Sequence, residues 1–344
     1  MDSRWKKSAQ FPVISSTASQ YLPMRSYHDI FNISTEFSPA TFTLVGIPGL
    51  EAEHRWVSIP FCVMYTIIFL GNGTILHVIR TDPALHQPMY FFLAMLAFVE
   101  LSVSTSTMPT VLGIFLFGIN DISFGGCLLQ MFSMHSFTLM ESGVLLAMSV
   151  DRFLAIYSPL RYTAILTVPR IAGICCFIAV RSLLLMLPLV ILLKCLPFCG
   201  HNSLTLSYCL HSDLIKLPCG DTRPNSILGL FVITFTFGPD ILLIVVSYIL
   251  ILHTVLRIAS GAGRKKALNT CVSHIFAVLV YYVPMVSLSL VHRFGRHLPR
   301  FLQTSMANVY LFFPPVVNPI VYSIKTKEIR HSIVRTLSKR RGEV

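Results

Sequence analysis

The sequence has few charged residues for its length. Asp, Glu, Lys and Arg make up 12% of the 344 residues, whereas 54% are hydrophobic. A soluble domain carries about 25% charged residues, so this chain has too little polar surface to cover a water-soluble globule. The composition therefore predicts a lipid bilayer as the solvent. In a bilayer every backbone polar group must be satisfied within the protein, which leaves only helices and closed β-barrels.

The sequence also lacks the alternating apolar pattern of membrane β-strands, which are about 10 residues long. Its apolar runs are long and unalternating, and a spanning helix needs about 20 residues. Seven runs are long enough, although the fourth contains Arg181 and the fifth contains Asp240. They are Val57–Ile79, Pro88–Leu112, Cys127–Ile156, Ile171–Leu193, Ser226–Leu252, Leu268–Val291 and Phe301–Ile324.

These runs predict the fold class, an all-α membrane protein built as a seven-transmembrane helix bundle with a short amphipathic helix after the seventh span. We expect an extracellular segment at residues 1–55, the bundle at 56–324 and a cytoplasmic tail at 325–344. Apolar residues of the tail recur at helical spacing, with bases on the other face: Ile329, Ile333, Val334 and Leu337. This pattern fits a helix on an anionic leaflet, and a disordered basic tail is the alternative.

The charge balance is strongly basic, with a formal net charge of +12. Lys and Arg lie between the apolar runs, where the positive-inside rule places them, so the charge does not indicate nucleic acid as a partner. With the N-terminus outside, the inner loops and tail hold more Lys and Arg than the outer segments. Residues 11–20 are too polar for the core of a signal peptide, so we expect the first span to direct membrane insertion. We expect the multi-pass protein to be located in the plasma membrane.

Four of the nine cysteines fall on the predicted outer side, where an oxidising compartment preserves disulfides. Cys127 begins the third span, and Cys199, Cys209 and Cys219 follow the fourth. Zinc binding by the loop cysteines is the alternative, but gaps of nine residues are wrong for paired ligands, and we expect no metal. The outer N-terminal segment also holds a glycosylation sequon, Asn32-Ile33-Ser34.

Five short motifs occur in order in the predicted spans and the inner loops. They are LHQPMY at residues 85–90, DRFLAI at 151–156, SPLRY at 158–162, KALNTCVSHI at 266–275 and NPIVY at 318–322. Together they resemble the odorant-receptor family of G-protein-coupled receptors, and the resemblance covers residues 37–335. GIPGLE at 46–51, HRFG at 292–295 and a long second outer loop resemble the class I, fish-like branch of that family.

The resemblance implies a receptor rather than an enzyme, and one without a cofactor. It implies that small volatile ligands, carboxylic acids among them, bind in the outer half of the bundle. The occupied receptor would activate a stimulatory, olfactory-type G protein and raise cAMP. The resemblance also implies that Cys127 pairs with Cys209, which leaves Cys199 with Cys219.

The sequence departs from the usual family pattern at a few positions. They are Glu100, Ser149, Val150 and Tyr157. The N-terminal segment is also longer than is usual in the family, so Met24 is a second candidate start beside Met1.

The resemblance assigns a conformational switch to the inner end of the third span. Asp151 would hold the guanidinium of Arg152 in the resting receptor, and Arg152 would turn toward the G protein on activation. Tyr248 and Tyr322 resemble the tyrosines that rearrange around this arginine. Pro319 permits a kink in the seventh span because it lacks a backbone N–H.

Ionisable residues inside a membrane are costly and usually functional. Glu100 and Glu141 fall in the middle of the second and third spans, and we expect them to form one polar cluster with Asn72 and Asn318. The cluster is either a proton or sodium site that biases the packing of the helices or a structural hydrogen-bond network. The sequence leaves both interpretations open.

The ligand pocket is expected between the outer halves of the third, fifth and sixth spans. Residues three or four apart lie on one helix face. Two such sets are candidates for its lining: Met131, His135 and Thr138 in the third span, and Tyr282, Val286, Ser289 and Arg293 in the sixth. They would form an apolar pocket with a few polar anchors. Core packing is the alternative for Met131 and Met134, and a snorkelling helix end for Arg293.

Two other classes of function fit the sequence less well. A transporter or channel predicts inverted repeats or pore-lining charges, and the sequence has no internal repeat and no ring of charges. A membrane enzyme would need acid–base or metal groups, for which Glu100, Glu141, His135 and Asp240 are the candidates. No His-x-x-x-His or Gly-x-Ser-x-Gly spacing supports that interpretation.

Overall fold

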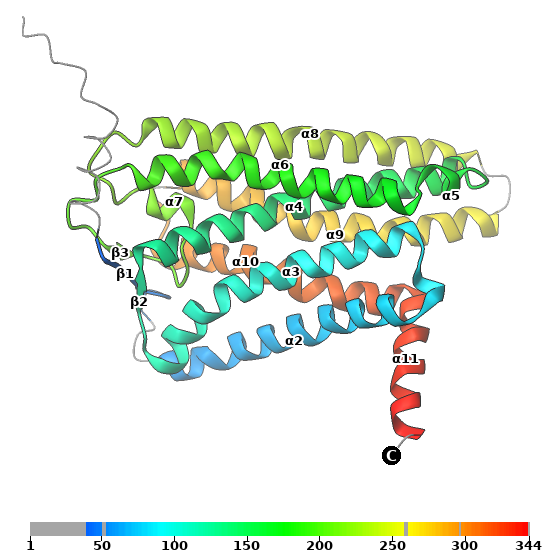
Figure 1. The fold of residues 1–344 in the computed structure, drawn as a ribbon, viewed down its shortest axis with the longest axis horizontal. Coiled ribbons are helices and arrows are strands. Elements are labelled where there is room, and N and C mark those ends of the chain that lie inside the picture. The colour runs from blue at the N-terminus through cyan, green and yellow to red at the C-terminus, as the bar shows by residue number, and fades with distance from the viewer. Residues whose placement is uncertain (1–38, 50–52, 258–260, 296, 343–344) are drawn as a thin grey trace, which may run out of the picture.

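Long helices that run side by side make up most of the chain (Figure 1). The computed structural model describes residues 39–49, 53–257, 261–295 and 297–342. The long helices are α2 (His54–Thr81), α3 (Pro88–Leu112), α4 (Phe124–Tyr157), α6 (Val168–Lys194), α8 (Arg223–Leu256), α9 (Gly261–Phe294) and α10 (Arg300–Lys325). Each predicted span lies within one of them, so the seven-helix prediction is confirmed. The sequon at Asn32 and the candidate start at Met24 lie outside the described residues.

Prolines help to set where these helices begin. Pro88, Pro169 and Pro224 each occupy the first turn of a helix, in α3, α6 and α8. At that position proline loses no intrahelical hydrogen bond, and its fixed φ angle suits the helix. Most of the helices extend a few residues beyond the predicted spans, because a helix can continue past the edge of the hydrocarbon core of the bilayer.

The helix α4 differs from the other long helices in composition. The other six are each long and apolar enough to cross a membrane, whereas α4 is not among the helices that meet this criterion in the described part of the chain. Its polar residues include Glu141, Asp151 and Arg152. It packs against α3, α6, α8 and α9, which places it in the middle of the bundle. A helix that meets other helices rather than lipid can carry polar side chains, provided that they find partners.

The two ends of the bundle carry different elements (Figure 1). We call the end with the disulfides the outer end and the end with Arg152 the inner end. At the outer end, β1 (Thr41–Leu44) lies between β2 (Asp121–Ser123) and β3 (Ser203–Leu204). It pairs antiparallel with β2 and parallel with β3. The buried ring of Phe42 on β1 lies 5.5 Å from the ring of Phe198, so this strand closes the bundle on its outer side.

Four short helical elements connect the long ones. They are η2 (Pro83–Leu85), η3 (Gly113–Phe117), α5 (Tyr162–Ile165) and α7 (His211–Leu214). Between β1 and α2, Gly46 and Gly49 both have a positive φ, which favours glycine over other residues. These two glycines belong to the motif at residues 46–51, of which Leu50 and Glu51 lie outside the described residues.

The tail forms a helix, α11 (Lys327–Gly342), which turns away from the line of α10 at the inner end and points away from the bundle (Figure 1). Ile329 is fully buried and Ile333 packs against the same apolar cluster, while Val334 is exposed. Arg335 Nη1 lies 3.4 Å from Asp82 Oδ2 and ties the helix to the loop between α2 and α3. The side chain of Leu337 lies outside the described residues. The predicted amphipathic helix therefore forms, and its contact with a lipid leaflet remains a prediction.

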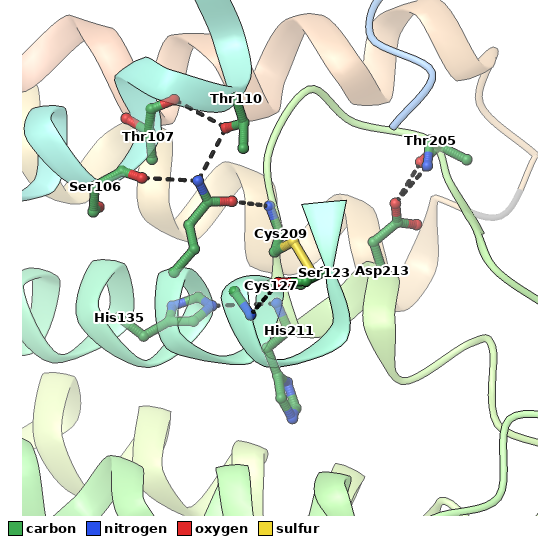
Figure 2. Close-up of a disulfide and its surroundings, with 12 residues drawn as sticks. Ser106, Thr107, Thr110, Ser123, Cys127, His135, Thr205, Cys209, His211 and Asp213 are labelled. Atoms are coloured by element: carbon green, nitrogen blue, oxygen red, sulfur yellow. Dashed lines mark hydrogen bonds between the residues drawn. A yellow bond between two sulfur atoms is a disulfide. The ribbon is translucent and has the colours of Figure 1, made fainter. Parts of the chain in front are cut away.

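Two disulfides hold the segment between α6 and α8, and Figure 2 shows the one between Cys127 and Cys209. They join Cys127 to Cys209 and Cys199 to Cys219, which is the pairing that the resemblance implies. Gln130, one turn after Cys127, accepts a hydrogen bond from the backbone N–H of Cys209 at 2.8 Å. This segment is therefore fixed on the outer end of α4 by both a covalent bond and a hydrogen bond.

Replacing Cys209 with Ser is expected to destabilise the outer end. The bond joins residues that are 82 positions apart in the sequence, and removing a native disulfide costs about 2–5 kcal/mol. We expect most of the receptor to be retained inside the cell, measured as the ratio of surface-labelled to total protein. Cys195→Ser is the matched control, since Cys195 is a free cysteine at the end of α6. Equal surface levels for both variants, or a free Cys209 thiol in the mature protein, would contradict this prediction.

Candidate ligand-binding site

A large cavity lies in the outer half of the bundle, between α4, α6, α8 and α9 and the segment that contains α7. Its volume is about 730 Å³, and small-molecule sites commonly measure about 300–1,000 Å³. The lining is polar near the outer end and apolar deeper in the bundle. The polar side chains include Ser212, Lys216, His292, Arg293 and Gln303, and the apolar ones include Leu139, Met186, Val232, Phe237 and Met285.

Two histidines join the loop wall of this cavity to the helices. His211 begins α7, and its backbone N–H donates to His135 Nε2 on α4 over 3.3 Å (Figure 2). Its own Nε2 lies 2.6 Å from Asn225 Oδ1 on α8. Burial lowers the pKa of His211, the hydrogen bond to Asn225 opposes this, and the charge of Arg293 lowers the pKa further. His211 is therefore neutral at physiological pH and positions the loop through hydrogen bonds.

The outer part of the cavity carries positive charge. Arg293 and Lys216 both line it, and none of its described lining residues is Asp or Glu. Lys216 Nζ lies 3.4 Å from Asp213 Oδ1, so part of its charge is already offset. Arg293 makes no ion pair with a described residue. Both ring nitrogens of His292 are buried and have no hydrogen-bond partner in the described part of the chain. Arg293 and His292 are thus free to bind a ligand.

The structure brings together only part of the predicted lining. His135, Thr138, Ser289 and Arg293 line the cavity. Met131 does not, because it is fully buried in the apolar cluster of the outer end, so the packing alternative is the correct one for it.

The predicted stripe on α9 is also partly wrong. Tyr282 lies deeper than the cavity, and Val286 is 41% exposed on the outer surface of the bundle. At about 100° per residue, the face that includes Met285, Ser289 and His292 is rotated by roughly 60° from the predicted stripe. Hydropathy could not have found this rotation, because both faces of the helix are apolar.

The sequence analysis missed several lining residues. His211, Ser212 and Lys216 come from the outer segment between Cys209 and Cys219. Cysteine spacing shows that this segment is held in place but does not show which side chains face inward. His292 was visible in the motif at 292–295, and its position beside Arg293 was the available signal.

An ion pair between a partly buried arginine and a buried aspartate lies deeper than the cavity and was also missed. Arg181 on α6 donates two hydrogen bonds to Asp240 on α8, at 3.1 Å and 3.0 Å. Ser142 Oγ on α4 donates to the same carboxylate at 2.6 Å and lies 2.8 Å from the hydroxyl of Tyr282 on α9. Four helices therefore meet in one polar network. Arg181 and Asp240, the charged residues within the fourth and fifth apolar runs, therefore neutralise each other.

A second, smaller cavity of about 20 Å³ lies among the predicted polar cluster. Glu100 and Glu141 both line it, and Asn318 Nδ2 donates to Glu100 Oε1 at 2.5 Å. Asn72 lies beside Glu100 and donates to the carbonyl of Pro315 at 3.2 Å. Glu141 Oε1 is buried without a hydrogen-bond partner among the described residues. The space is large enough for about one water molecule, and a proton or sodium site at its two carboxyl groups remains a prediction.

The predicted switch residues lie near one another at the inner end. Arg152 Nη2 lies 2.9 Å from Asp151 Oδ2, and the hydroxyl of Tyr162 donates to Asp151 Oδ1 at 2.6 Å. Tyr248 hydrogen-bonds to His274 Nδ1 rather than to the arginine. The buried hydroxyl of Tyr322 has no hydrogen-bond partner within the described ranges. Asp151 thus holds Arg152, while neither tyrosine is hydrogen-bonded to the arginine.

This combination defines a class of protein. A seven-helix membrane bundle with an outer cavity for a small molecule and an Asp-Arg pair at the inner end of its third long helix is a G-protein-coupled receptor. The family model described as "Olfactory receptor" matches residues 61–340. The chain therefore belongs to the olfactory receptor family.

Curated relatives agree with this assignment. Human olfactory receptor 51I2 is 53% identical over 306 residues, which cover 89% of this chain and 97% of that protein. Human olfactory receptor 51F2 is 49% identical over 96% of this chain and 95% of its own length. Human olfactory receptor 51G2 is 54% identical over 86% of this chain and 94% of its own length. The chain is thus an odorant receptor of the plasma membrane, with small-molecule ligands and G-protein partners, and not an enzyme.

The ion pair between Arg181 and Asp240 predicts a non-additive pattern of stability. Removing one partner of a buried pair costs about 3–5 kcal/mol, because the remaining charge has no counter-ion. Asp240→Leu alone and Arg181→Met alone should each lower the melting temperature of the detergent-solubilised receptor. The double variant should recover most of the loss, since both charges are gone. If the two single losses simply add in the double variant, the residues do not act as a pair.

Proposed function

We propose that this odorant receptor detects small organic acids and signals through a stimulatory, olfactory-type G protein that raises cAMP. One observation carries the choice of ligand. The outer part of the cavity is lined by Arg293 and Lys216 and by no described carboxylate. An anion would find charge complementarity there, whereas a cation would be repelled.

Arg293 is the proposed anchor for the acid. A guanidinium can bind a carboxylate through two parallel hydrogen bonds, and Ser289, about one turn deeper on α9, lines the same cavity. A hydrogen bond to a charged group contributes about 1.5–3 kcal/mol, or roughly 10- to 150-fold in affinity. Arg293 is exposed, so water screens the contact, and we expect a value near the lower end, about tenfold.

Binding at this point can bias the position of α9. Ser289, His292 and Arg293 all belong to α9, whereas His135 and Lys216 lie on α4 and the outer segment. An acid that contacts both sides would draw the outer end of α9 inward. A ligand shifts a conformational equilibrium only through its different affinity for the two states, and this contact provides such a difference.

The second part of the proposal concerns the inner end. Asp151 would release Arg152 when the inner end of α9 moves, and Arg152 would then contact the G protein together with the inner loops. Tyr248 and Tyr322 would rearrange around it. Tyr248, Tyr322 and His274 all lie within electrostatic range of the Arg152 guanidinium, which supports this role.

The polar cluster would contribute to the same equilibrium. Glu100 and Glu141 face one small space from two helices, α3 and α4. Two ionised carboxylates that line the same small space would repel, so a shared proton or a small cation would favour the packing that keeps them together. Loss of the shared proton or cation would favour a packing in which α3 and α4 hold the two carboxylates farther apart.

Arg152→Ala is expected to silence the cAMP response while surface delivery remains measurable. The substitution removes the charge that contacts the G protein and leaves the outer cavity unchanged. The response is measured with a cAMP reporter at matched surface expression. Arg170→Ala is the control, since Arg170 is an exposed arginine in the first turn of α6 whose side chain donates to the backbone carbonyls of Ala164 and Ile165. A parental response from Arg152→Ala would remove this residue from the switch.

Arg293→Ala should lower the potency of an acid agonist by about tenfold, whereas the charge-conserving Arg293→Lys should lower it less. The methyl ester of the same acid should be weak on the parent and insensitive to both substitutions. The measurement is a concentration–response series at matched surface expression. If an acid activates all three receptors equally, Arg293 is not its anchor. If only neutral compounds activate the parent, the acid ligand itself is wrong.

A further inference from the structure

The ligand cavity reaches well beyond the groups that would bind an acid. Arg293 lies at the outer end of α9, and Met285 lines the same cavity eight positions earlier in the helix. At 1.5 Å per residue the two positions are separated by about 12 Å along the axis. The cavity is therefore much longer than a carboxylate with a few carbon atoms.

The inner half of the cavity is mostly apolar, with Thr138 and Tyr310 as its polar lining residues. Leu139 of α4, Met186 of α6, Val232 and Phe237 of α8 and Met285 of α9 line it. A short acid held at Arg293 would leave these side chains without contacts or in contact with water. Both alternatives are unfavourable, because apolar surface is stabilised when it is removed from water.

Phe237 is the innermost of the α8 residues that line the cavity. It is 6% exposed, and its ring centroid lies 6.3 Å from that of Tyr282 in an edge-on arrangement and 6.4 Å from that of Tyr281. Tyr282 is in turn hydrogen-bonded to Ser142. A ligand that reaches Phe237 would therefore press on a ring that touches α9 one turn deeper than Met285.

We propose that the ligand is an amphipathic acid with a long apolar body, whose carboxylate binds at the outer end and whose tail lies against Phe237. An extended chain advances about 1.2 Å per bond, as a polypeptide advances about 3.5 Å for every three bonds. About ten bonds therefore bridge the distance of about 12 Å. This inference rests on the proposed acid receptor function and specifies the size class of its ligand.

The tail also gives the ligand a second point of action on α9. The carboxylate acts on the outer end of the helix through Arg293, and the tail acts near Tyr282 through Phe237. Because the two contacts lie on either side of Pro284, a long ligand can act on both parts of the helix. A short ligand reaches only the outer part.

The first test is a homologous series of straight-chain carboxylates from butanoate to dodecanoate, with the primary alcohols of equal length as controls. Potency on the parent receptor is read with the cAMP reporter. Each methylene that enters the apolar half should improve potency by about fourfold. We expect the gain to continue up to a chain of about ten bonds, where the tail meets Phe237.

The second test moves the inner limit. Phe237→Ala removes a ring from the inner end and should lengthen the most potent acid by a few carbons. Val232→Phe fills part of the inner half of the cavity and should shorten the most potent acid. Phe235→Ala is the matched control on the same helix, since Phe235 does not line the cavity, is 59% exposed on the side surface of the bundle and stacks on Phe231. It should leave the best chain length unchanged. The two opposite shifts keep the test valid if one variant fails to reach the surface.

The outcomes separate the inference from the function on which it rests. If butanoate is the most potent acid and its potency still depends on Arg293, the inference of a long ligand is wrong, whereas the proposed acid-receptor function is retained. If the alcohols show the chain-length dependence and its shifts in the two variants while the acids remain inactive, the apolar tail site is supported. The binding of a carboxylate at Arg293 is then wrong. No response to any member of either series, at normal surface expression, would overturn the inference.

Discussion

The structure depends on how α4 satisfies its polar side chains away from water. This helix is too polar to face lipid along its length, and it crosses the membrane because α3, α6, α8 and α9 surround it. Its partners are arranged along its length: Cys209 at the outer end, Asp240 in the middle and Tyr162 at the inner end. Each partner belongs to a different segment, so α4 is also the element that fixes the others in place.

The same arrangement connects the ligand cavity to the polar cluster. Thr138 and Tyr310 line both the large outer cavity and the small cavity of Glu100 and Glu141. The hydroxyl of Tyr310 donates to Thr138 Oγ1 at 3.2 Å, and the hydroxyl of Tyr281 donates to the Thr138 carbonyl at 2.7 Å. A movement of α9 or α10 that alters these bonds changes both cavities together. Thr138, Tyr281 and Tyr310 are therefore sufficient to connect the two cavities.

The sequence predicts most of the fold and a smaller part of the site, for a physical reason. A spanning segment is a local property, so length and hydropathy located every long helix. Which face of a helix points inward depends on its neighbours, and α9 is apolar on both the cavity side and the lipid side. Val286 was therefore misplaced, and Met131 was assigned to the cavity rather than to the core. Arg181 and Asp240 were each noticed, but their pairing depends on how two helices lie side by side.

The cavity itself is built from two kinds of structure. Its helical walls are braced below by the network of Arg181, Asp240, Ser142 and Tyr282, while its outer wall is a loop segment held by two disulfides. Because the braces are not themselves lining residues, a change such as one at Val232 or Lys216 can alter the ligand that fits without disturbing them. Residues that hold the bundle together and residues that face the ligand are thus largely separate. That separation allows a receptor with this framework to change its ligand preference while the proposed switch at Arg152 stays the same.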